Sequence, residues 1–249
     1  MVFLKSHSEI DKIRQAGRIL AEVLARIEEE VAPGVSTLDL DTIAEEVISS
    51  HPGARAAFKG YGGFPNAVCT SVNEMVVHGI PSRECCLKQG DIIGVDVGVF
   101  LNGYYSDAAR TYPVGEPSEE ISRLLEVTRE ALDKGTDRAR VNSHIGDIGS
   151  AVQEYVEQNG YNVVRDLVGH GIGQNLHEDP QVPNYGNPGR GLKITEGLVL
   201  AIEPMVNQGT AEVKTLGDNW TVVTADGKLS AHFENTVAVG PDGPEILTG

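Results

Sequence analysis

The sequence predicts a single α+β domain in which helices back a mostly antiparallel sheet. Three observations favour this fold class. Each half of the chain places two helical segments before several strand-like segments, Asn102-Gly103 joins two long strand candidates, and no low-complexity linker divides the 249 residues. The repeated order indicates two pseudo-symmetric halves, at about 1–115 and 116–249, although no residue-level repeat accompanies it.

Two helices are expected in the first half. Ser8 and Asp11 form a capping-box pattern, which starts a helix that continues to about residue 30, before a Pro-Gly pair. A serine or threonine at 36–37 can cap a second helix that ends near residue 50. The glycine-rich segment 58–65 is predicted to be a loop.

The second half repeats this order. Ser118 follows a proline and precedes two glutamates, a pattern that opens a third helix. A fourth helix is expected at 144–158, where Asn159-Gly160 ends it. Strands are predicted at 67–71, 75–78, 91–102, 104–113, 161–167, 197–203, 220–224 and 232–239.

The turn at Asn102-Gly103 sets the register of a hairpin, because this dipeptide suits a two-residue type I′ turn. Gly98 then lies opposite Asp107. Asp96, two residues before Gly98, shares a sheet face with Asp107 at a diagonal distance of roughly 7–8 Å, within reach of one shared ion. The residues alone leave open that Asp107 is simply an exposed residue at the end of the hairpin.

Three acidic residues, Asp96, Glu203 and Glu234, interrupt apolar, strand-like runs. An ionised carboxylate withdrawn from water is destabilising by several kcal/mol unless a cation meets it. No Lys or Arg lies within any of these three runs. The compensating charge must come from elsewhere in the fold, and a divalent metal ion is its most compact source.

Composition describes an ordinary globular chain and argues against several functions. Its 36 acidic and 20 basic residues give a net charge of −16, which disfavours nucleic acid or an anionic membrane as the main partner. The N-terminus has no unbroken apolar stretch of the kind that a signal peptide or membrane span needs, so a cytosolic protein is expected. Three cysteines, Cys69, Cys85 and Cys86, imply no disulfide framework.

A glycine-rich segment at 169–173 surrounds His170. A phosphate-binding loop would open a helix, whereas Pro180 and Pro183 follow this segment. The glycines are better suited to let backbone and substrate approach the imidazole closely. Taken alone, His170 also fits a structural, partly buried histidine.

Together these residues resemble a known family, the type I methionine aminopeptidases of the pita-bread fold, over nearly the whole chain. Each matching segment is weak evidence alone, but their joint occurrence in this order is highly specific. The segments are 69–81, 96–107, 169–173, 177–180, 202–205 and 233–236. The resemblance implies one catalytic domain in which the two halves share a curved sheet.

By this resemblance, two divalent metal ions would be held by Asp96, Asp107, His170, Glu203 and Glu234. Asp107 and Glu234 would bridge the ions. Four carboxylates balance two dications in charge, and an oxygen-rich set with one imidazole suits Mn, Fe or Co at least as well as Zn. Such a pair of ions can activate a bridging hydroxide, which attacks the scissile carbonyl without a Ser or Cys nucleophile.

The resemblance also implies roles beside the metal ions. Glu203 would act as general acid/base, and His78 and His177 would hydrogen-bond the substrate amide and the developing oxyanion. The pocket for the methionine side chain would be lined by Tyr61, Phe64, Cys69, Leu176 and Trp220. Phe64 replaces a commoner Tyr, and Leu176 stands where some members have Phe. Both changes can alter the depth of the methionine pocket. From the residues alone, each also fits an ordinary core or loop hydrophobe.

The implied activity is removal of the N-terminal methionine from nascent polypeptides whose second residue is small. The enzyme would be cytoplasmic and monomeric, with transient ribosome contact and no nucleic acid or membrane partner. Two alternatives share the fold. One is a proline-specific aminopeptidase or prolidase, which usually has an added N-terminal domain. The other is a non-catalytic peptide-binding protein, which would normally lack one or more of the metal-ligating residues. Phosphoester hydrolysis is disfavoured, because no Arg or Lys cluster could hold a phosphate.

Overall fold

The computed structural model describes all residues 1–249. The helices are α1 (His7–Glu30), α2 (Thr37–Ser50), α3 (Glu119–Thr136) and α4 (Ile145–Gln158), with a short 3₁₀ helix at Tyr61–Gly63. The strands are β1 (Arg55–Ala56), β2 (Val68–Val72), β3 (Met75–Val77), β4 (Ile92–Leu101), β5 (Tyr104–Pro113), β6 (Asn162–Val163), β7 (Gly169–Gly171), β8 (Glu178–Val182), β9 (Val199–Ile202), β10 (Met205–Asn207), β11 (Val213–Thr215), β12 (Val222–Thr224), β13 (Ser230–His232), β14 (Asn235–Gly240) and β15 (Gly243–Ile246).

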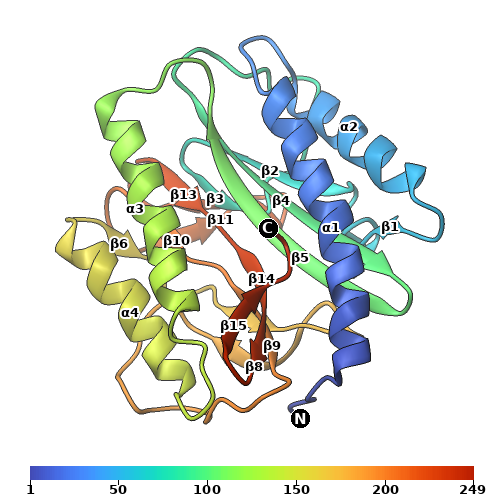
Figure 1. Cartoon of the computed structure of the whole chain (residues 1–249). Coiled ribbons are helices and arrows are strands. Elements are labelled where there is room, and N and C mark those ends of the chain that lie inside the picture. The colour runs from blue at the N-terminus through green and yellow to red at the C-terminus, as the bar shows by residue number, and fades with distance from the viewer.

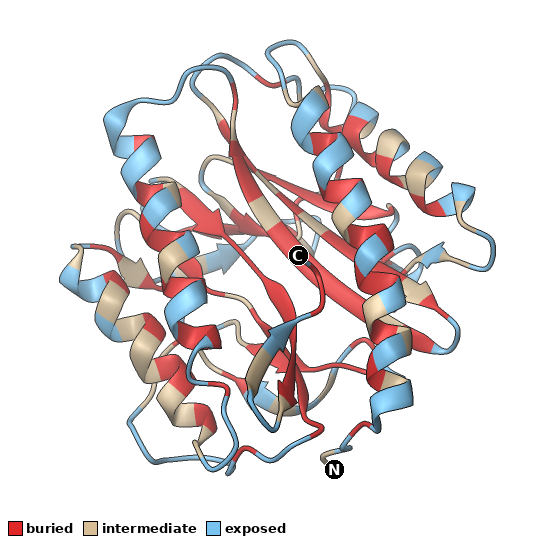
Figure 2. Ribbon diagram, viewed as in Figure 1, coloured by how far each residue is buried: buried red, intermediate tan, exposed pale blue.

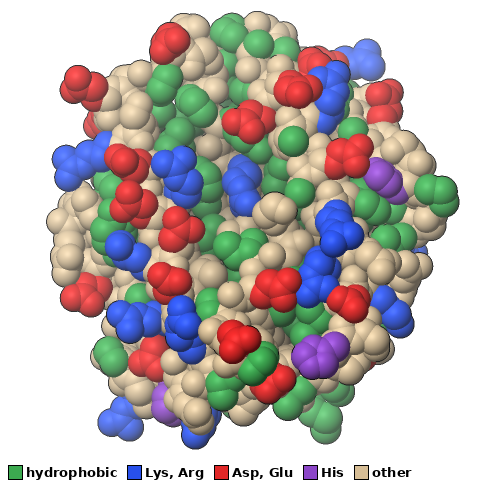
Figure 3. Space-filling view, in the orientation of Figure 1, with side chains coloured by type: hydrophobic (Ala, Val, Ile, Leu, Met, Phe, Trp, Pro, Cys, Tyr) green, Lys and Arg blue, Asp and Glu red, His purple; other side chains and the backbone are tan.

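The helices form two pairs that cover the strands, as predicted (Figure 1). α1 packs against α2 and over β4 and β5, whereas α3 packs against α4 and contacts strands of the second half. The helix faces that meet the strands are buried and the opposite faces are exposed (Figure 2). On the side of the molecule that carries the helices, acidic and basic side chains are intermingled (Figure 3). None of the helices is long and apolar enough to span a membrane.

The strands divide into four sheets, and every strand pair is antiparallel. The first sheet has the order β1-β4-β2 with β5 paired to β4, and the others are β13-β10-β6, β11-β12-β3 and β15-β14-β9-β7-β8. The predicted hairpin is present as β4 and β5. Apart from the long β4–β5 ladder, the sheets are built from short ladders, and the chain passes from one sheet to another at several points.

The start of α1 differs from the prediction. Its N-cap is Ser6, whose backbone N–H and hydroxyl donate to the Glu9 carboxylate at 2.8 and 2.6 Å. The capping box predicted at Ser8 and Asp11 is therefore wrong, because an acid three residues after Ser6 already satisfies the N-cap and places Ser8 inside the first turn. The other three helices begin within one residue of their predicted starts.

Two predicted strands are interrupted at their acidic residues. The strand predicted at 232–239 is two strands, of which β13 pairs with β10 and β14 pairs with β9. The strand predicted at 197–203 ends at Ile202, and the chain resumes as β10 in the other sheet. Glu234 and Glu203 lie in these two breaks. An apolar run predicts a strand, but it does not reveal a change of pairing partner.

Other strands escaped prediction because their residues have little intrinsic strand preference. β7 consists of Gly-His-Gly, and β8 contains Pro180, yet both belong to the five-stranded sheet. β8 is an edge strand, where a residue without a backbone N–H is tolerated. The strand predicted at 161–167 is limited to the two residues of β6. These segments become strands through pairing rather than local sequence: β7 pairs with β9, β8 with β7, and β6 with β10.

Candidate metal centre and active site

The β4–β5 hairpin brings Asp96 and Asp107 together as the turn predicted. Asn102 and Gly103 have φ values of 52° and 88°, the positive values that a type I′ turn needs. Gly98 pairs with Asp107, so Asp96 lies one diagonal step away on the same sheet face. Asp107 is 4% exposed, which excludes the alternative of a solvent-exposed residue at the hairpin end.

The two breaks between sheets bring Glu203 and Glu234 to the same place, and β7 adds His170. Ligand atoms of Asp107, His170 and Glu234 lie within 4.8 Å of one another. Oε1 of Glu203 is 3.7 Å from Nε2 of His170. Asp96 lies outside the tight group of three but lines the same cavity. The five predicted ligands thus surround one volume.

Asp107 and Glu234 are buried, Asp96 and Glu203 are partly buried, and no Lys or Arg forms an ion pair with any of these four carboxylates. The only side chains within ion-pair distance of Asp107 and Glu203 are imidazoles, and burial raises the pKa of Asp96 to about 7. Burial, and then mutual repulsion, raises the pKa of Asp107, Glu203 and Glu234 well above the usual range. One oxygen each of Asp96, Asp107 and Glu234 is buried and makes no hydrogen bond within the protein. Divalent metal ions fit this donor set, because they would satisfy these oxygens and their charge together.

His170 has the tautomer that a metal ligand requires. Its Nδ1 lies 2.9 Å from the carbonyl oxygen of Gly171, which can only accept, so Nδ1 carries the proton. Burial lowers the pKa of His170 to about 3, which keeps the ring neutral. Nε2 therefore presents a lone pair toward the carboxylates, at 4.0 Å from Asp107 and 3.7 Å from Glu203.

A second buried imidazole, His232, was missed by the sequence reasoning. Its Nε2 lies 3.7 Å from Oε2 of Glu203, so Glu203 has one imidazole near each carboxylate oxygen. Burial lowers the pKa of His232 to about 3. The signal was present in the sequence, because His232 interrupts the same apolar run as Glu234, two residues before it.

Side chains of β5 and β14 hydrogen-bond the backbone at Asp107 and Glu234 and so help to fix these two acids. The Thr236 hydroxyl accepts from the backbone N–H of Asp107 at 3.0 Å and donates to its carbonyl oxygen at 2.8 Å. Arg110 donates to the backbone carbonyl of Glu234 and, at 2.8 Å, to Oδ1 of Asn235. These bonds hold Asp107 and Glu234 at a set separation, although they come from different halves of the chain.

All twelve residues predicted for the site line one cavity of about 140 Å³. They are Tyr61, Phe64, Cys69, His78, Asp96, Asp107, His170, Leu176, His177, Glu203, Trp220 and Glu234, and Phe58 is a further lining residue that was not predicted. Phe64 and Trp220 pack edge to face, with ring centroids 5.2 Å apart. The acids and the apolar side chains thus share one space.

His177 and His78 line the cavity together with the acids. The His177 ring lies 4.3 Å from the His170 ring, and its Nδ1 is 2.8 Å from the Tyr61 hydroxyl. His78 has a φ of 59°, a left-handed value that a non-glycine residue adopts only where its surroundings hold it. Burial lowers the pKa of both rings, so both are neutral hydrogen-bonding groups near pH 7.

Comparison with known proteins identifies the class first. Residues 11–241 match metallopeptidase family M24, and the chain belongs to this family. It is 58% identical over 249 residues to a methionine aminopeptidase of Clostridium perfringens, which covers 100% of this chain and 99% of that protein. Within the metallopeptidases, the chain accordingly belongs with the methionine aminopeptidases.

Solved structures lead to the same grouping. The methionine aminopeptidase of Thermotoga maritima has a TM-score of 0.97 and 47% sequence identity, with 100% of this chain and 99% of that chain covered. A prolidase of Pyrococcus horikoshii has a TM-score of 0.77 at 22% identity, with 99% of this chain and 63% of that chain covered. The second likeness shows the fold alone. The α+β pita-bread fold expected from the sequence is confirmed.

Proposed function

We propose that this protein is a dinuclear-metal aminopeptidase that hydrolyses the N-terminal methionine from polypeptides whose second residue is small. One observation carries the proposal: a single cavity joins a cluster of buried acids to an apolar pocket. Its volume of about 140 Å³ is far below the roughly 300–1,000 Å³ of cavities that take drug-sized ligands. Such a space suits one terminal side chain, which an exopeptidase requires.

Two divalent ions would be held by Asp96, Asp107, His170, Glu203 and Glu234. When bound, they lower the pKa of a water molecule and polarise the scissile carbonyl. The oxygen-rich set suits Mn, Fe or Co at least as well as Zn. The buried oxygens without hydrogen-bond partners on three of these residues support this assignment.

Glu203 is suited to carry the proton that hydrolysis transfers. Glu203 lines the cavity beside the other acids, and a carboxylate in this position can accept a proton and release it again. It would take a proton from the attacking water and give it to the departing amine. Nε2 of His232, at 3.7 Å, faces its other oxygen.

His177 is suited to stabilise the developing oxyanion. If the Tyr61 hydroxyl donates to Nδ1 of His177, the proton of the neutral ring lies on Nε2 and is free to donate to substrate. His78 would hydrogen-bond the substrate amide from the side of the cavity that Trp220 lines; these two rings lie 6.4 Å apart. The methionine thioether would enter between Phe64, Trp220 and Leu176.

Peptide hydrolysis after metal depletion and reloading tests the proposal. Protein treated with chelator should lose turnover of Met-Ala-Ser and recover it when Mn or Co is added. Preferential turnover of Xaa-Pro peptides would indicate a proline-specific relative instead, and metal-loaded protein that binds peptides without cleaving them would indicate a binding module. A phosphoesterase is disfavoured further, because no Lys or Arg lines the cavity.

The proposal includes a setting for the enzyme. A substrate that exists on nascent chains places it in the cytoplasm, as a monomer whose site stays open to the emerging peptide and with transient ribosome contact. Sedimentation velocity of the purified protein tests the monomer. Co-sedimentation with translating ribosomes, at low and moderate salt, tests the contact.

A further inference from the structure

The N-terminal segment carries an ion pair unlike the others in the molecule. Nζ of Lys5 lies 2.6 Å from Oε2 of Glu178, and the two side chains are only 5% and 4% exposed. In every other Lys or Arg pair both side chains are at least 26% exposed. Burying two charges is destabilising unless their geometry and remaining hydrogen bonds compensate. A buried ion pair of this kind does not serve solubility, so it indicates a structural or functional role.

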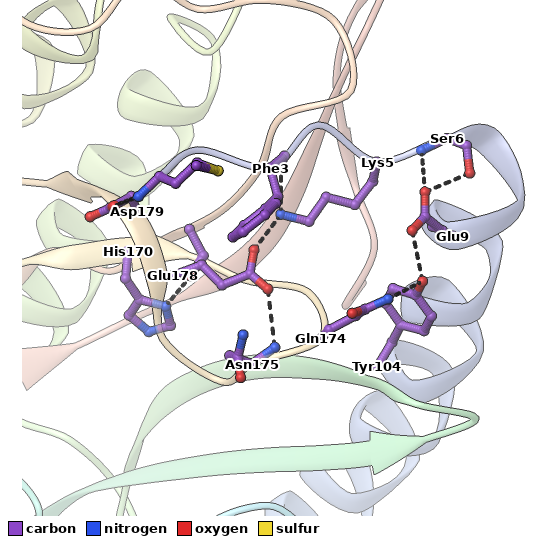
Figure 4. Close-up of polar contacts among 12 residues, drawn as sticks. Phe3, Lys5, Ser6, Glu9, Tyr104, His170, Gln174, Asn175, Glu178 and Asp179 are labelled. Atoms are coloured by element: carbon purple, nitrogen blue, oxygen red, sulfur yellow. Dashed lines mark hydrogen bonds and ion pairs between the residues drawn. The ribbon is translucent and has the colours of Figure 1, made fainter.

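The remaining bonds of the pair tie it to the backbone on both sides (Figure 4). Lys5 also donates to the carbonyl oxygen of Phe3 at 2.9 Å, and its own backbone N–H donates to Gly197 at 2.7 Å. Oε1 of Glu178 accepts from the backbone N–H of Asn175 at 3.0 Å. One carboxylate thus links the N-terminal segment to the four-residue turn Asn175–Glu178.

That turn carries two residues of the site. Leu176 and His177 lie between Asn175 and Glu178, and neither forms a backbone–backbone hydrogen bond of its own. The Glu178 carboxylate is therefore the tie that closes the turn around them. Lys5 also lies close to Gly173, two residues before the turn, because a Cβ on Gly173 would lie 2.4 Å from Cε of Lys5.

We infer that Lys5 is a positioning residue for His177, because its ion pair with Glu178 closes the turn that holds the imidazole against His170. The inference rests on the proposed function, in which His177 contacts the substrate. Loss of the pair leaves Glu178 buried without its cation, and the turn opens as the carboxylate seeks water. His177 then loses its alignment, and small misplacements of a catalytic group have large effects on rate.

A double-mutant cycle with kcat as the readout tests this inference. Lys5→Met keeps the length and removes the charge, and we expect kcat on Met-Ala-Ser to fall by about tenfold at full metal content. In a His177→Ala background the same change should lower kcat by less than about twofold, because the residue through which Lys5 acts is gone. Equal factors in both backgrounds, or an unchanged kcat in folded Lys5→Met, would overturn the inference.

Two further variants keep the test decisive. Arg14→Met breaks an exposed pair of α1 with Glu245 and should leave kcat unchanged in both backgrounds. Glu178→Gln removes the charge but keeps an oxygen that can accept from Asn175, so it replaces Lys5→Met if that variant does not fold. It should lower kcat by a smaller factor than Lys5→Met. This loss of kcat should also vanish in the His177→Ala background. An additive loss for Glu178→Gln would count against the inference.

A readout independent of activity separates this inference from the proposed function. The ring nitrogen resonances of His177 in a long-range ¹H–¹⁵N spectrum should shift in Lys5→Met and stay in place in Arg14→Met. If wild-type protein fails to cleave methionyl peptides while these resonances shift, the proposed function fails and the positioning role stands. Unshifted resonances would overturn the positioning role itself.

Discussion

The two halves of the molecule supply their acids in different ways. In the first half, Asp96 and Asp107 lie inside two continuous ten-residue strands whose register a single turn fixes. In the second half, Glu203 and Glu234 lie between short strands, where the chain leaves one sheet for another. The hairpin places its acids by local geometry, whereas the breaks place theirs only after two sheets have assembled.

This difference shows what each half requires of the metal ions. The hairpin has a full ladder of backbone hydrogen bonds that holds Asp107 whatever its charge. The breaks have fewer such bonds, and mutual repulsion among the acids works against them. Metal binding should therefore order the second half more than the first.

The largest expected effect on kcat/KM comes from replacing Asp107 or Glu234, one acid from each half. Asp107→Asn and Glu234→Gln should each lower kcat/KM by about 10³-fold or more, since metal-ion chemistry accounts for several kcal/mol of transition-state stabilisation and each 1.36 kcal/mol is a factor of ten. Metal content, measured by elemental analysis, should fall in both. Asp137→Asn, at an exposed position, is the matched control.

Stability of the same variants sharpens the comparison of the halves. Without metal, removal of one buried charge should raise the melting temperature, and more for Glu234→Gln than for Asp107→Asn, because the hairpin holds its acid more rigidly. Equal increases would show that the two halves respond alike. A lowered melting temperature in both metal-free variants would contradict the account of repulsion.

An intermediate effect is expected at the turn Asn175–Glu178 of the second half, which supplies none of the five predicted metal ligands. His177→Ala should lower kcat by about 10²-fold, the usual loss for one oxyanion donor, while metal content stays intact. Single-turnover kinetics with elemental analysis checks both statements. A wild-type kcat in this variant would remove His177 from the mechanism.

The smallest effect is expected in the apolar pocket. Leu176→Ala removes a side chain that is 1% exposed, and kcat/KM for methionyl peptides should fall by about tenfold, within the 1–3 kcal/mol typical of lost apolar contacts in a specificity pocket. Stability should fall by about 2–5 kcal/mol. Leu132→Ala removes a comparably buried side chain on the inner face of α3 and should match the stability loss without changing kcat/KM. A matching loss of kcat/KM would show that the effect of Leu176→Ala is not specific to the pocket.

Sequence reasoning worked where local rules suffice. The turn residues Asn102 and Gly103 determined a register that the structure reproduces, and the helix caps at Ser36 and Ser118 determined two helix starts. The buried acids were found as anomalies in apolar runs. The five ligands and the pocket came from resemblance to a family, and the structure brings them into one cavity.

Other features depend on tertiary pairing that no local pattern expresses. β7 and β8 are rich in glycine and polar residues, and they become strands because β7 pairs with β9 and β8 pairs with β7. The breaks at Glu203 and Glu234 reflect a change of partner. His232 was visible as a buried polar residue but acquires meaning only from its distance to Glu203. The tie between Lys5 and Glu178 spans 173 positions in sequence.

The central claim is that metal ions neutralise the buried acids, and the pH dependence of unfolding with and without metal tests it most directly. Burial and mutual repulsion raise the pKa of Asp107, Glu203 and Glu234, so the folded metal-free protein retains protons that the unfolded chain has lost. The unfolding free energy of metal-free protein should fall from about pH 7.5 to pH 8.5, where the histidines are largely neutral in both states. Protein loaded with Mn should be more stable and show little slope. Equal stability and equal slopes with and without metal would contradict the claim.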